Sequence, residues 1–165
     1  QDIGGRLQVE AVGFQQQGDN MIRMAGMFPN VQFVNSAEFT HTGYELQLHW
    51  LPVDEFRLSL NWTDMDLGDE TRQTPEKKFG ANLSYTVGRF DFGGSVMHVS
   101  DLFGTDFRQQ PLPDYTLVNL SARANVYGGL VAALHLQNLL DERYYTMSGY
   151  PMPGSNVKVG LEYEF

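Results

Sequence analysis

Cysteine is absent from this chain of 165 residues, which excludes disulfide scaffolds, thiolate metal sites and cysteine nucleophiles. Basic residues are few: 11 Lys and Arg stand against 20 Asp and Glu, for a net charge of −9. Nucleic-acid binding selects basic surfaces, so we expect no nucleic-acid partner. No run reaches the roughly 18 consecutive apolar residues that a membrane-spanning helix needs. Only strands could carry this chain across a bilayer.

The last stretch of the chain, 155–165, alternates with a period of two. One row is apolar and ends in the aromatic residues Tyr163 and Phe165, while Lys158, Glu162 and Glu164 belong to the other row. This pattern predicts a strand with one apolar and one polar face. A soluble sandwich could end in such a strand. An outer-membrane β-barrel gives a reason for the aromatic finish, because its outward face meets lipid and its aromatic residues lie at the interface.

The same alternation predicts strands along most of the chain. The first covers about 6–24, either as one strand with a bulge at Gly13 or as two short strands, because a glycine inside a strand pattern suggests a bulge. The others are expected at 38–50, 56–63, 78–87, 90–100, 118–126 and 130–137. The phase of the strand at 90–100 is blurred by Gly93 and Gly94.

The length of the strands and the alternation of short and long connections favour a membrane barrel over a soluble Greek-key sandwich. The strands have about 9 to 13 residues, the length that a tilted strand needs to cross a bilayer. Short connections at 52–54, 88–89 and 128–129 alternate with long ones at 25–36, 64–75, 101–114 and 138–154, as periplasmic turns alternate with external loops. We therefore predict an all-β fold, a transmembrane antiparallel up-and-down β-barrel with about eight strands in this chain.

Several motifs resemble those of TonB-dependent outer-membrane receptors. Asn138-Leu139-Leu140-Asp141 with Tyr144 is similar to the Asn-Leu-Phe-Asp-x-x-Tyr signature near the end of these receptors, with Leu140 in place of phenylalanine. The segment 150–154 and the strand after it resemble their finish, although Ser155 replaces a common arginine. Upstream, Asn35 and then Gly43 and Glu45 resemble the Asn…Gly-x-Glu-aliphatic strand of the family, and Thr74-Pro75 its strand entry.

The resemblance implies a large barrel of roughly 22 strands with a plugged lumen, of which residues 1–165 would be the C-terminal segment without the plug domain. It implies uptake of a ferric siderophore or similar nutrient across the outer membrane of a Gram-negative bacterium, with no enzymatic step and no cofactor. The implied partners are outer-membrane lipid, the rest of the barrel and its plug, TonB acting through that plug, the barrel-assembly machinery, and an iron chelate or cobalamin-like ligand. Tyr163 and Phe165 would be the assembly signal.

Another interpretation is a complete small outer-membrane barrel with a structural, adhesive or lipid-enzyme role. An open sheet of eight strands would leave two unpaired edges in lipid. Either further strands complete the wall, or these strands close on themselves. No secretory leader is recognisable at Gln1, so we expect a mature protein or a piece of a longer one.

Candidate binding residues lie in the long loops. Aromatic side chains there could grip a siderophore or cobalamin-like ligand, or pack loop against loop: Phe103, Phe107, Tyr115, Tyr144, Tyr145 and Tyr150. Asp64, Asp66, Asp69 and Glu70 form a weak candidate for a calcium loop, because their spacing does not match the EF-hand and external loops are often acidic. His41, His49, His98 and His135 lack metal-ligand spacing, and we assign no catalytic or metal residue.

Overall fold

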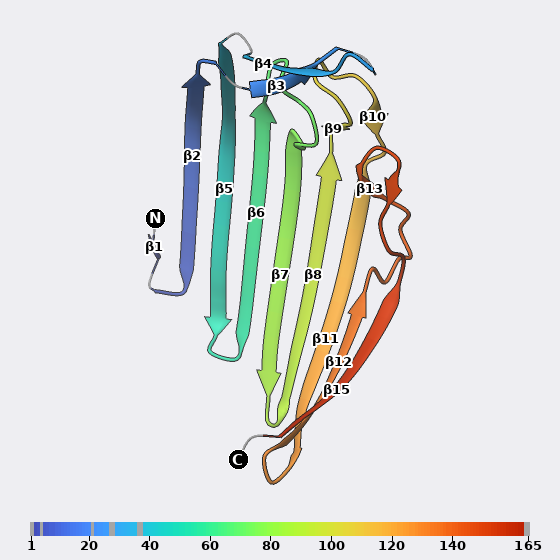
Figure 1. Cartoon of the computed structure of the whole chain (residues 1–165). Helices are drawn as coiled ribbons and strands as arrows, with labels where there is room; N and C mark the ends of the chain where they lie inside the picture. Colours follow the sequence, from blue (N-terminus) through green and yellow to red (C-terminus); the bar gives the residue numbers. More distant parts are fainter. Residues whose placement is uncertain (1, 4, 21, 27–28, 36–37, 164–165) are drawn as a thin grey trace.

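The long strands form one antiparallel sheet (Figure 1). The computed structural model describes residues 2–3, 5–20, 22–26, 29–35 and 38–163. The sheet has nine strands in the order β1-β2-β5-β6-β7-β8-β11-β12-β15. Their bounds are β1 Asp2–Ile3, β2 Leu7–Gly18, β5 Phe39–Val53, β6 Phe56–Asp66, β7 Lys77–Val87, β8 Phe90–Ser100, β11 Tyr115–Tyr127, β12 Leu130–Gln137 and β15 Asn156–Tyr163. In the described part of the chain no helix is long and apolar enough to cross a membrane.

Long and short connections lie at opposite ends of the sheet (Figure 1), as their alternation along the sequence predicts. Three small hairpins are built into the long connections: β3 (Ile22–Ala25) with β4 (Gln32–Asn35), β9 (Leu102–Phe103) with β10 (Pro111–Leu112), and β13 (Tyr145–Met147) with β14 (Tyr150–Pro151). At the other end, only two residues separate β5 from β6, β7 from β8 and β11 from β12. We call these the loop end and the turn end.

The first predicted strand needs correction. Residues Leu7 to Gly18 pair with Trp50 to Phe39 without a register shift, so the bulge predicted at Gly13 is wrong. The Tyr44 ring lies over Gly13, and a Cβ there would be 3.6 Å from it. The chain forms two strands, as the other alternative has it, because β3 leaves the main sheet to pair with β4; Met21 lies outside the described residues. Irregular pairing occurs instead between Trp50 and Val53, just before the first short turn.

The registers bring the alternating residues of all strands into phase. One row across the sheet is apolar: Leu7, Trp50, Leu58, Leu83, Gly94, Leu120, Leu136 and Val157. The adjacent row is polar: Gln8, His49, Ser59, Asn82, Ser95 and Asn119. Because successive side chains of a strand point to opposite faces, the sheet has one apolar and one polar face. The pairing also fixes the phase of β8 and places His98 in the apolar register.

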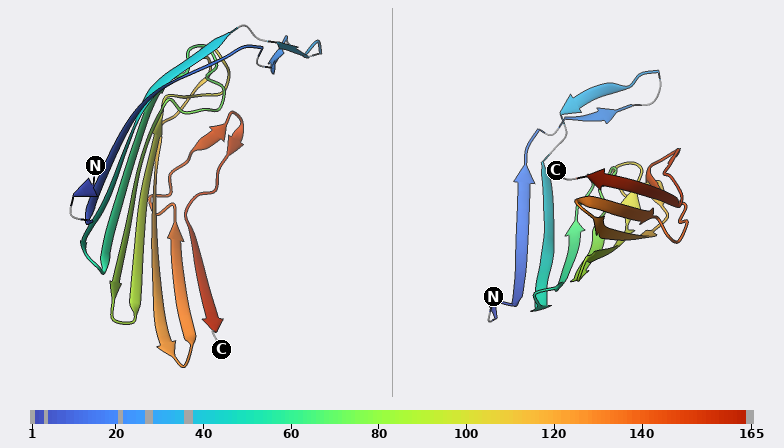
Figure 2. Two further views of the ribbon diagram at one scale, coloured as in Figure 1. Left: turned by 90° about the vertical axis from the view of Figure 1, so that its left-hand side faces the viewer. Right: turned by 90° about the horizontal axis from the view of Figure 1, so that it is seen from below.

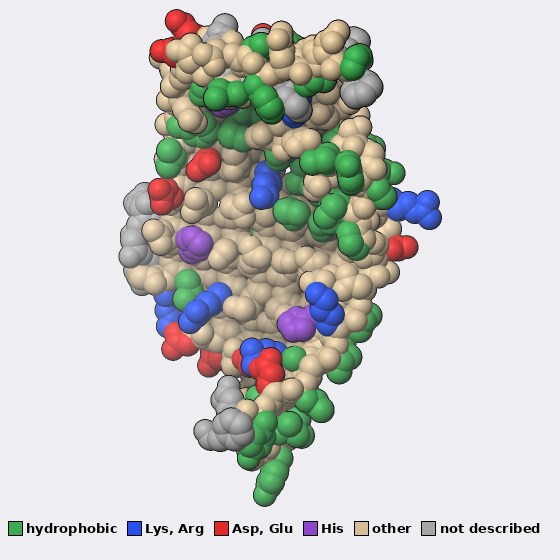
Figure 3. Space-filling view, viewed as in Figure 1, with side chains coloured by type: hydrophobic (Ala, Val, Ile, Leu, Met, Phe, Trp, Pro, Cys, Tyr) green, Lys and Arg blue, Asp and Glu red, His purple; other side chains and the backbone are tan. Residues whose placement is uncertain are grey.

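The polar face is the concave one. The strands follow an arc in the view from below, and β15 curls toward the same side as the loops (Figure 2). Charged side chains and histidines are scattered over this face, whereas hydrophobic side chains gather near its loop end (Figure 3). Here Arg123 bonds Glu162 at 2.8 Å and His49 bonds Ser59 at 2.9 Å. A water-accessible lumen accounts for such polar pairs.

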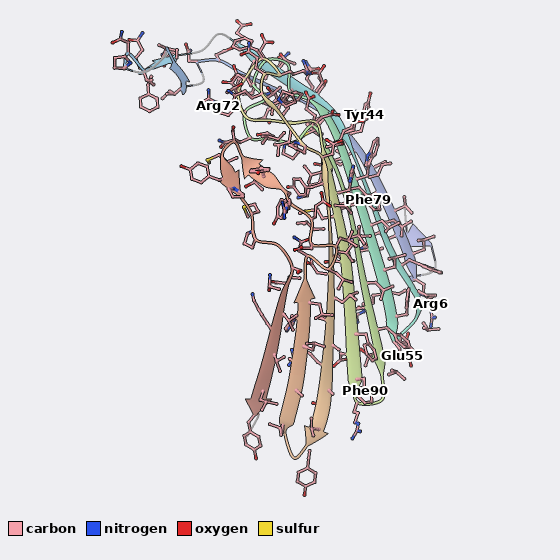
Figure 4. All side chains as sticks on the ribbon, turned by 90° about the vertical axis from the view of Figure 1, so that its right-hand side faces the viewer. Arg6, Tyr44, Glu55, Arg72, Phe79 and Phe90 are labelled. Atoms are coloured by element: carbon pink, nitrogen blue, oxygen red, sulfur yellow. The ribbon has the colours of Figure 1, made fainter. Side chains whose placement is uncertain are left out.

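The convex face carries two belts of aromatic side chains, with Tyr44 and Phe79 toward the loop end and Phe90 at the turn end (Figure 4). In the lower belt the rings of Trp50 and Phe56 are 6.1 Å apart, and those of Phe56 and Tyr85 are 6.5 Å apart. Phe56 is eight residue steps along β6 from Asp64, the partner of Tyr44, which is about 26 Å. This is the scale of the apolar band of outer-membrane barrels.

The sheet is open. Among the described residues, β15 pairs with β12 and β1 pairs with β2, and these two edges do not meet. The strands therefore do not close on themselves as the small-barrel interpretation requires, and the all-β prediction is confirmed as a curved wall rather than a complete cylinder.

The faces of β15 can be tested with spin labels at Val159 and Gly160 in the full-length protein. Val159 is 78% exposed and lies in the apolar register opposite Leu134, while Gly160 lies opposite Ala133 in the polar register. We expect the label at 159 to be relaxed by oxygen dissolved in lipid, and the label at 160 to be relaxed by a water-soluble nickel chelate. The reverse pattern would contradict the face assignment.

Candidate functional site

The loop end is organised around two long loops, 67–76 and 101–114, which are bonded to each other along their length. The backbone N–H of Gln73 donates to the Phe103 carbonyl at 2.8 Å, and that of Phe107 donates to the Asp69 carbonyl at 2.7 Å. Such bonds fix the two loops in a single arrangement. We call the pair the double loop.

Arg108 joins the double loop to the end of β6. Its Nη2 donates to Glu76 Oε1 at 2.8 Å and to Asp66 Oδ1 at 2.7 Å, and its Nε donates to Glu76 Oε2 at 3.4 Å. Glu76 is buried, and its Oε1 also accepts the Leu67 N–H at 3.3 Å. The hydrogen bonds to Glu76 and then to Asp66 raise the pKa of Arg108 above its already high ordinary value, so the guanidinium is a permanent cation here.

Two further side chains complete this network. Thr71 is fully buried; its Oγ1 donates to the Thr105 carbonyl at 3.0 Å and accepts the Arg108 N–H at 3.0 Å. Asp106 accepts the Arg72 N–H at 3.1 Å, and Arg72 lies among the loops on the concave side (Figure 4). Buried polar groups are costly unless they are bonded, so each of these bonds favours the observed loop conformation.

The acidic residues at the end of β6 do not assemble a calcium site. Asp66 Oδ1 accepts from Gly68 N–H at 2.9 Å and from Arg108, so it is already engaged. Asp64 sits within β6 opposite Tyr44, while Asp69 and Glu70 lie in the following loop. Within the described ranges no three histidine or acidic side chains converge as a metal site would require. The bond to Arg108 is the role that the structure gives to Asp66.

An apolar cluster lies under the loops on the concave face. Its buried members are Val99, Leu102, Tyr115 and Leu117, and Tyr144 packs against them. The Tyr115 and Tyr144 rings are 4.6 Å apart. Tyr144 comes from loop 138–155, so the cluster fixes the start of the β13–β14 hairpin against the wall.

Asn138 anchors the base of that loop. It is buried and has φ of 50°, a left-handed conformation that asparagine tolerates better than most residues. Its Nδ2 donates to the carbonyls of Glu142 at 2.9 Å and Pro153 at 3.2 Å, and its Oδ1 accepts the Glu142 N–H at 2.9 Å. Its own N–H donates to Asn119 Oδ1 at 2.9 Å. One side chain therefore joins both ends of the loop.

Asp141 forms the second anchor of the loop. Its Oδ1 accepts the Ser155 N–H at 2.8 Å, next to the start of β15. The backbone and then the side-chain hydrogen bonds of Ser155 lower the pKa of this carboxyl below its ordinary value. A Cβ on Gly154 would be 2.5 Å from Asp141 Oδ1, so any other residue there would displace this carboxylate from its present position. The Asn138–Asp141 motif thus fixes the conformation of the loop at 138–155.

The positions of the upstream motif residues Gly43 and Glu45 also have a structural explanation. A Cβ on Gly43 would approach the Asp64 carbonyl to 2.7 Å and the Phe14 ring to 2.8 Å, which explains why a glycine stands there. Glu45 lies on the polar face, opposite Val12 and Thr63.

The predicted aromatic contact residues divide into two groups. Tyr115 and Tyr144 pack together in the apolar cluster, and Phe103 is half-buried in the double loop. Tyr145 is half-buried, and Phe107 and Tyr150 are 51% and 66% exposed. Tyr163 is exposed on the apolar face, while Phe165 lies outside the described residues. The prediction missed Arg108, Glu76 and Thr71, whose partners are more than 30 residues away in sequence.

Comparisons with known proteins agree with this architecture. A family model described as TonB dependent receptor-like, beta-barrel, matches residues 1–139. The ferric-pyoverdine BN7/BN8 receptor of Pseudomonas putida is 26% identical over 99% of this chain, which spans 21% of that receptor.

Two solved structures share the fold. The pyoverdine outer membrane receptor FpvA from Pseudomonas aeruginosa PAO1, bound to pyoverdine, has a TM-score of 0.78 at 18% identity, over 99% of this chain and 28% of its own. The copper transporter OprC has a TM-score of 0.80 at 16% identity, over 99% of this chain and 30% of its own. One of these proteins binds pyoverdine and the other transports copper, so the fold alone does not identify a ligand.

Proposed function

The chain belongs to the TonB-dependent receptor β-barrel family, and from this premise we propose that it forms part of the wall and mouth of a receptor that takes up a ferric siderophore. The family's barrels lie in the outer membrane of Gram-negative bacteria. The observation that carries the proposal is the match to a ferric-pyoverdine receptor, which extends over 99% of this chain and so includes the loops as well as the strands.

The polar concave face would line the lumen, and the convex face with its aromatic belts would meet lipid. The loop end would then be external and the turn end periplasmic, as in barrels with long outer loops and short inner turns. Residues 1–165 would be the C-terminal segment of the barrel, with the rest of the wall and the plug supplied by another part of the full receptor. TonB would act through that plug.

The family consists of receptors and transporters, and we propose no bond-making step for this chain. A self-contained small barrel with an adhesive or lipid-enzyme role has less support, because β15 and β1 do not pair.

The proposal is tested with the full-length receptor in a strain that lacks its own siderophore receptors. Cells expressing the receptor should grow on ferric pyoverdines when iron is limiting, and should bind the labelled chelate. Cells with an empty vector should not. Growth and binding equal to the empty vector for every ferric siderophore tried would contradict the proposed function.

Phe107 and Tyr150 are the most exposed of the predicted aromatic contact residues, at 51% and 66%, so they are the best placed of these to contact a ligand. Phe107→Ala and Tyr150→Ala should each weaken binding of the labelled siderophore about tenfold, the size of one aromatic contact. Tyr127 is a matched control, since it is 86% exposed at the turn end. Tyr127→Ala should leave affinity unchanged, and equal effects of all three variants would point to a general loss of folding.

We also propose that Tyr163 and Phe165 help the barrel-assembly machinery to recognise the strand that ends the wall. An apolar, aromatic strand edge is a ready partner for strand pairing before the barrel closes. Phe165→Asp should lower the amount of folded receptor several-fold, counted by heat-modifiable gel mobility. Siderophore bound per folded barrel should stay the same, because the turn end is far from the loops. Normal assembly with lost binding would contradict this role.

A further inference from the structure

The apolar face is interrupted by a notch at Gly94. In the register, Gly94 lies between Leu83 and Leu120, in a row whose other members are large. In the next row Ala122 lies between Phe92 and Leu134. These two small residues leave a hollow of about 330 Å³, with walls made by five larger side chains: Leu83, Phe92, Leu120, Leu134 and Leu136.

The walls of the notch are hydrocarbon. Gly93 and Ser121 also border it, but their side-chain positions belong to the polar register of the sheet. A buried water needs two to four polar partners, and the apolar register offers none at this point. An empty notch would leave its lining atoms without dispersion contacts, and the hydrogen-bonded strands around it cannot collapse to fill it. An apolar occupant is therefore favoured.

The position of the notch identifies the kind of occupant. It lies on the convex face between the two aromatic belts and is continuous with the apolar rows that would meet the bilayer. Its volume is at the lower end of the range for ligand pockets, which suits a narrow flexible chain better than a ring system. We propose that the notch holds one acyl chain of a membrane lipid, an inference that rests on the membrane placement in the proposed function.

The geometry supplies variants that fill the notch from inside the wall. A Cβ on Gly94 would be 3.6 Å from Leu120 Cδ2, which is ordinary contact. Gly94→Leu should therefore occupy the notch, while Gly94→Ala leaves most of it open as a matched control. Ala122→Leu fills it from β11 instead. Gly93 is left unchanged, because a Cβ there would approach Ser121 Oγ to 2.4 Å.

The experiment uses the full-length receptor in vesicles containing a phospholipid with a photoactivatable diazirine in its acyl chain. After illumination, mass spectrometry maps the labelled residues in β7, β8, β11, β12 and β15. In wild type we expect labelling to concentrate at Leu83, Phe92, Leu120 and Leu134. Per folded barrel, Gly94→Leu and Ala122→Leu should reduce it about fivefold, because the contacts of the chain with the notch are dispersion contacts. Gly94→Ala should label like wild type.

A second arm adds unlabelled lipopolysaccharide as a competitor, to distinguish an acyl chain of lipid A from one of a phospholipid; either result agrees with an acyl-chain site. Labelling that is even over β12 and β15, or equal in Gly94→Leu and wild type, would overturn the proposal. Crosslinks to a second protein at these residues would overturn it in favour of a protein interface. Siderophore binding, measured on the same samples, should not change in these variants. A result against lipid binding in the notch can therefore be distinguished from a result against the proposed receptor function.

Discussion

Replacing Arg108 with alanine should loosen loops 67–76 and 101–114 together. Glu76 would remain buried without the guanidinium that neutralises it, and Asp66 would lose its partner. Removing one partner of a buried ion pair costs 3–5 kcal/mol, but Arg108 and Asp66 are 45% and 68% exposed, so about 2 kcal/mol is a better figure here. Hydrogen exchange at the amides of Gln73 and Phe107 should then accelerate about 30-fold.

Lys77→Ala is the matched control for Arg108→Ala. Lys77 forms a 2.8 Å ion pair with Asp101 beside the same loops, but neither partner is buried: the two side chains are 50% and 43% exposed, against 10% for Glu76. Exposed pairs contribute about 0–1 kcal/mol, so exchange at the same amides should change by less than about fivefold. Siderophore affinity should fall in Arg108→Ala and not in Lys77→Ala. Unchanged exchange in Arg108→Ala would mean that the backbone bonds alone hold the double loop.

Replacing Asn138 with alanine should release the loop at 138–155 from the wall. The substitution leaves the N–H and carbonyl of Glu142 and the carbonyl of Pro153 without their partner. It also places alanine at a φ of 50°. The lost hydrogen bonds to buried groups and the strain of the left-handed conformation should together destabilise the loop by about 3 kcal/mol. Limited proteolysis of intact cells should cut this loop, which we expect to resist cleavage in wild type.

Asn138→Gly separates the two contributions. Glycine adopts the left-handed conformation without strain but restores none of the side-chain bonds, so it should recover about 1 kcal/mol of the loss. Asn138→Asp keeps the acceptor for Glu142 N–H and loses the donor, and should fall between wild type and alanine. If all three variants resisted cleavage like wild type, the packing of Tyr144 would be sufficient to hold the loop.

The strands and their faces could be predicted because their signal is local. Period-two alternation can be recognised within a single strand, so the two faces of that strand can be predicted without knowing which strand pairs with it. The errors occurred where the partner mattered. Gly13 suggested a bulge, but the strand pairs with β5 through this position without a register shift. Residues 22–25 alternate like the strand before them, yet they pair with β4 instead of β5.

The loop end was harder to predict, because its contacts join distant segments. Aromatic composition marked Tyr115, Tyr144 and Phe107 equally, although the first two pack together and the third is exposed. The bond between Arg108 and Glu76 spans 32 residues, and nothing near either residue indicates the other. The Asn138–Asp141 motif could be recognised, but its role follows only from where its hydrogen bonds go.

The double loop has a consequence for engineering receptor specificity. Loops are the obvious modules to exchange between homologous barrels, and the strands that carry them are regular enough to accept grafts. Here, a graft of 101–114 alone would remove Arg108 and leave the recipient's Glu76 buried and unpaired, while a graft of 67–76 alone would break the same bond from the other side. Segments 66–76 and 101–114 should therefore be transplanted as one cassette, which carries its internal bonds with it into the new barrel.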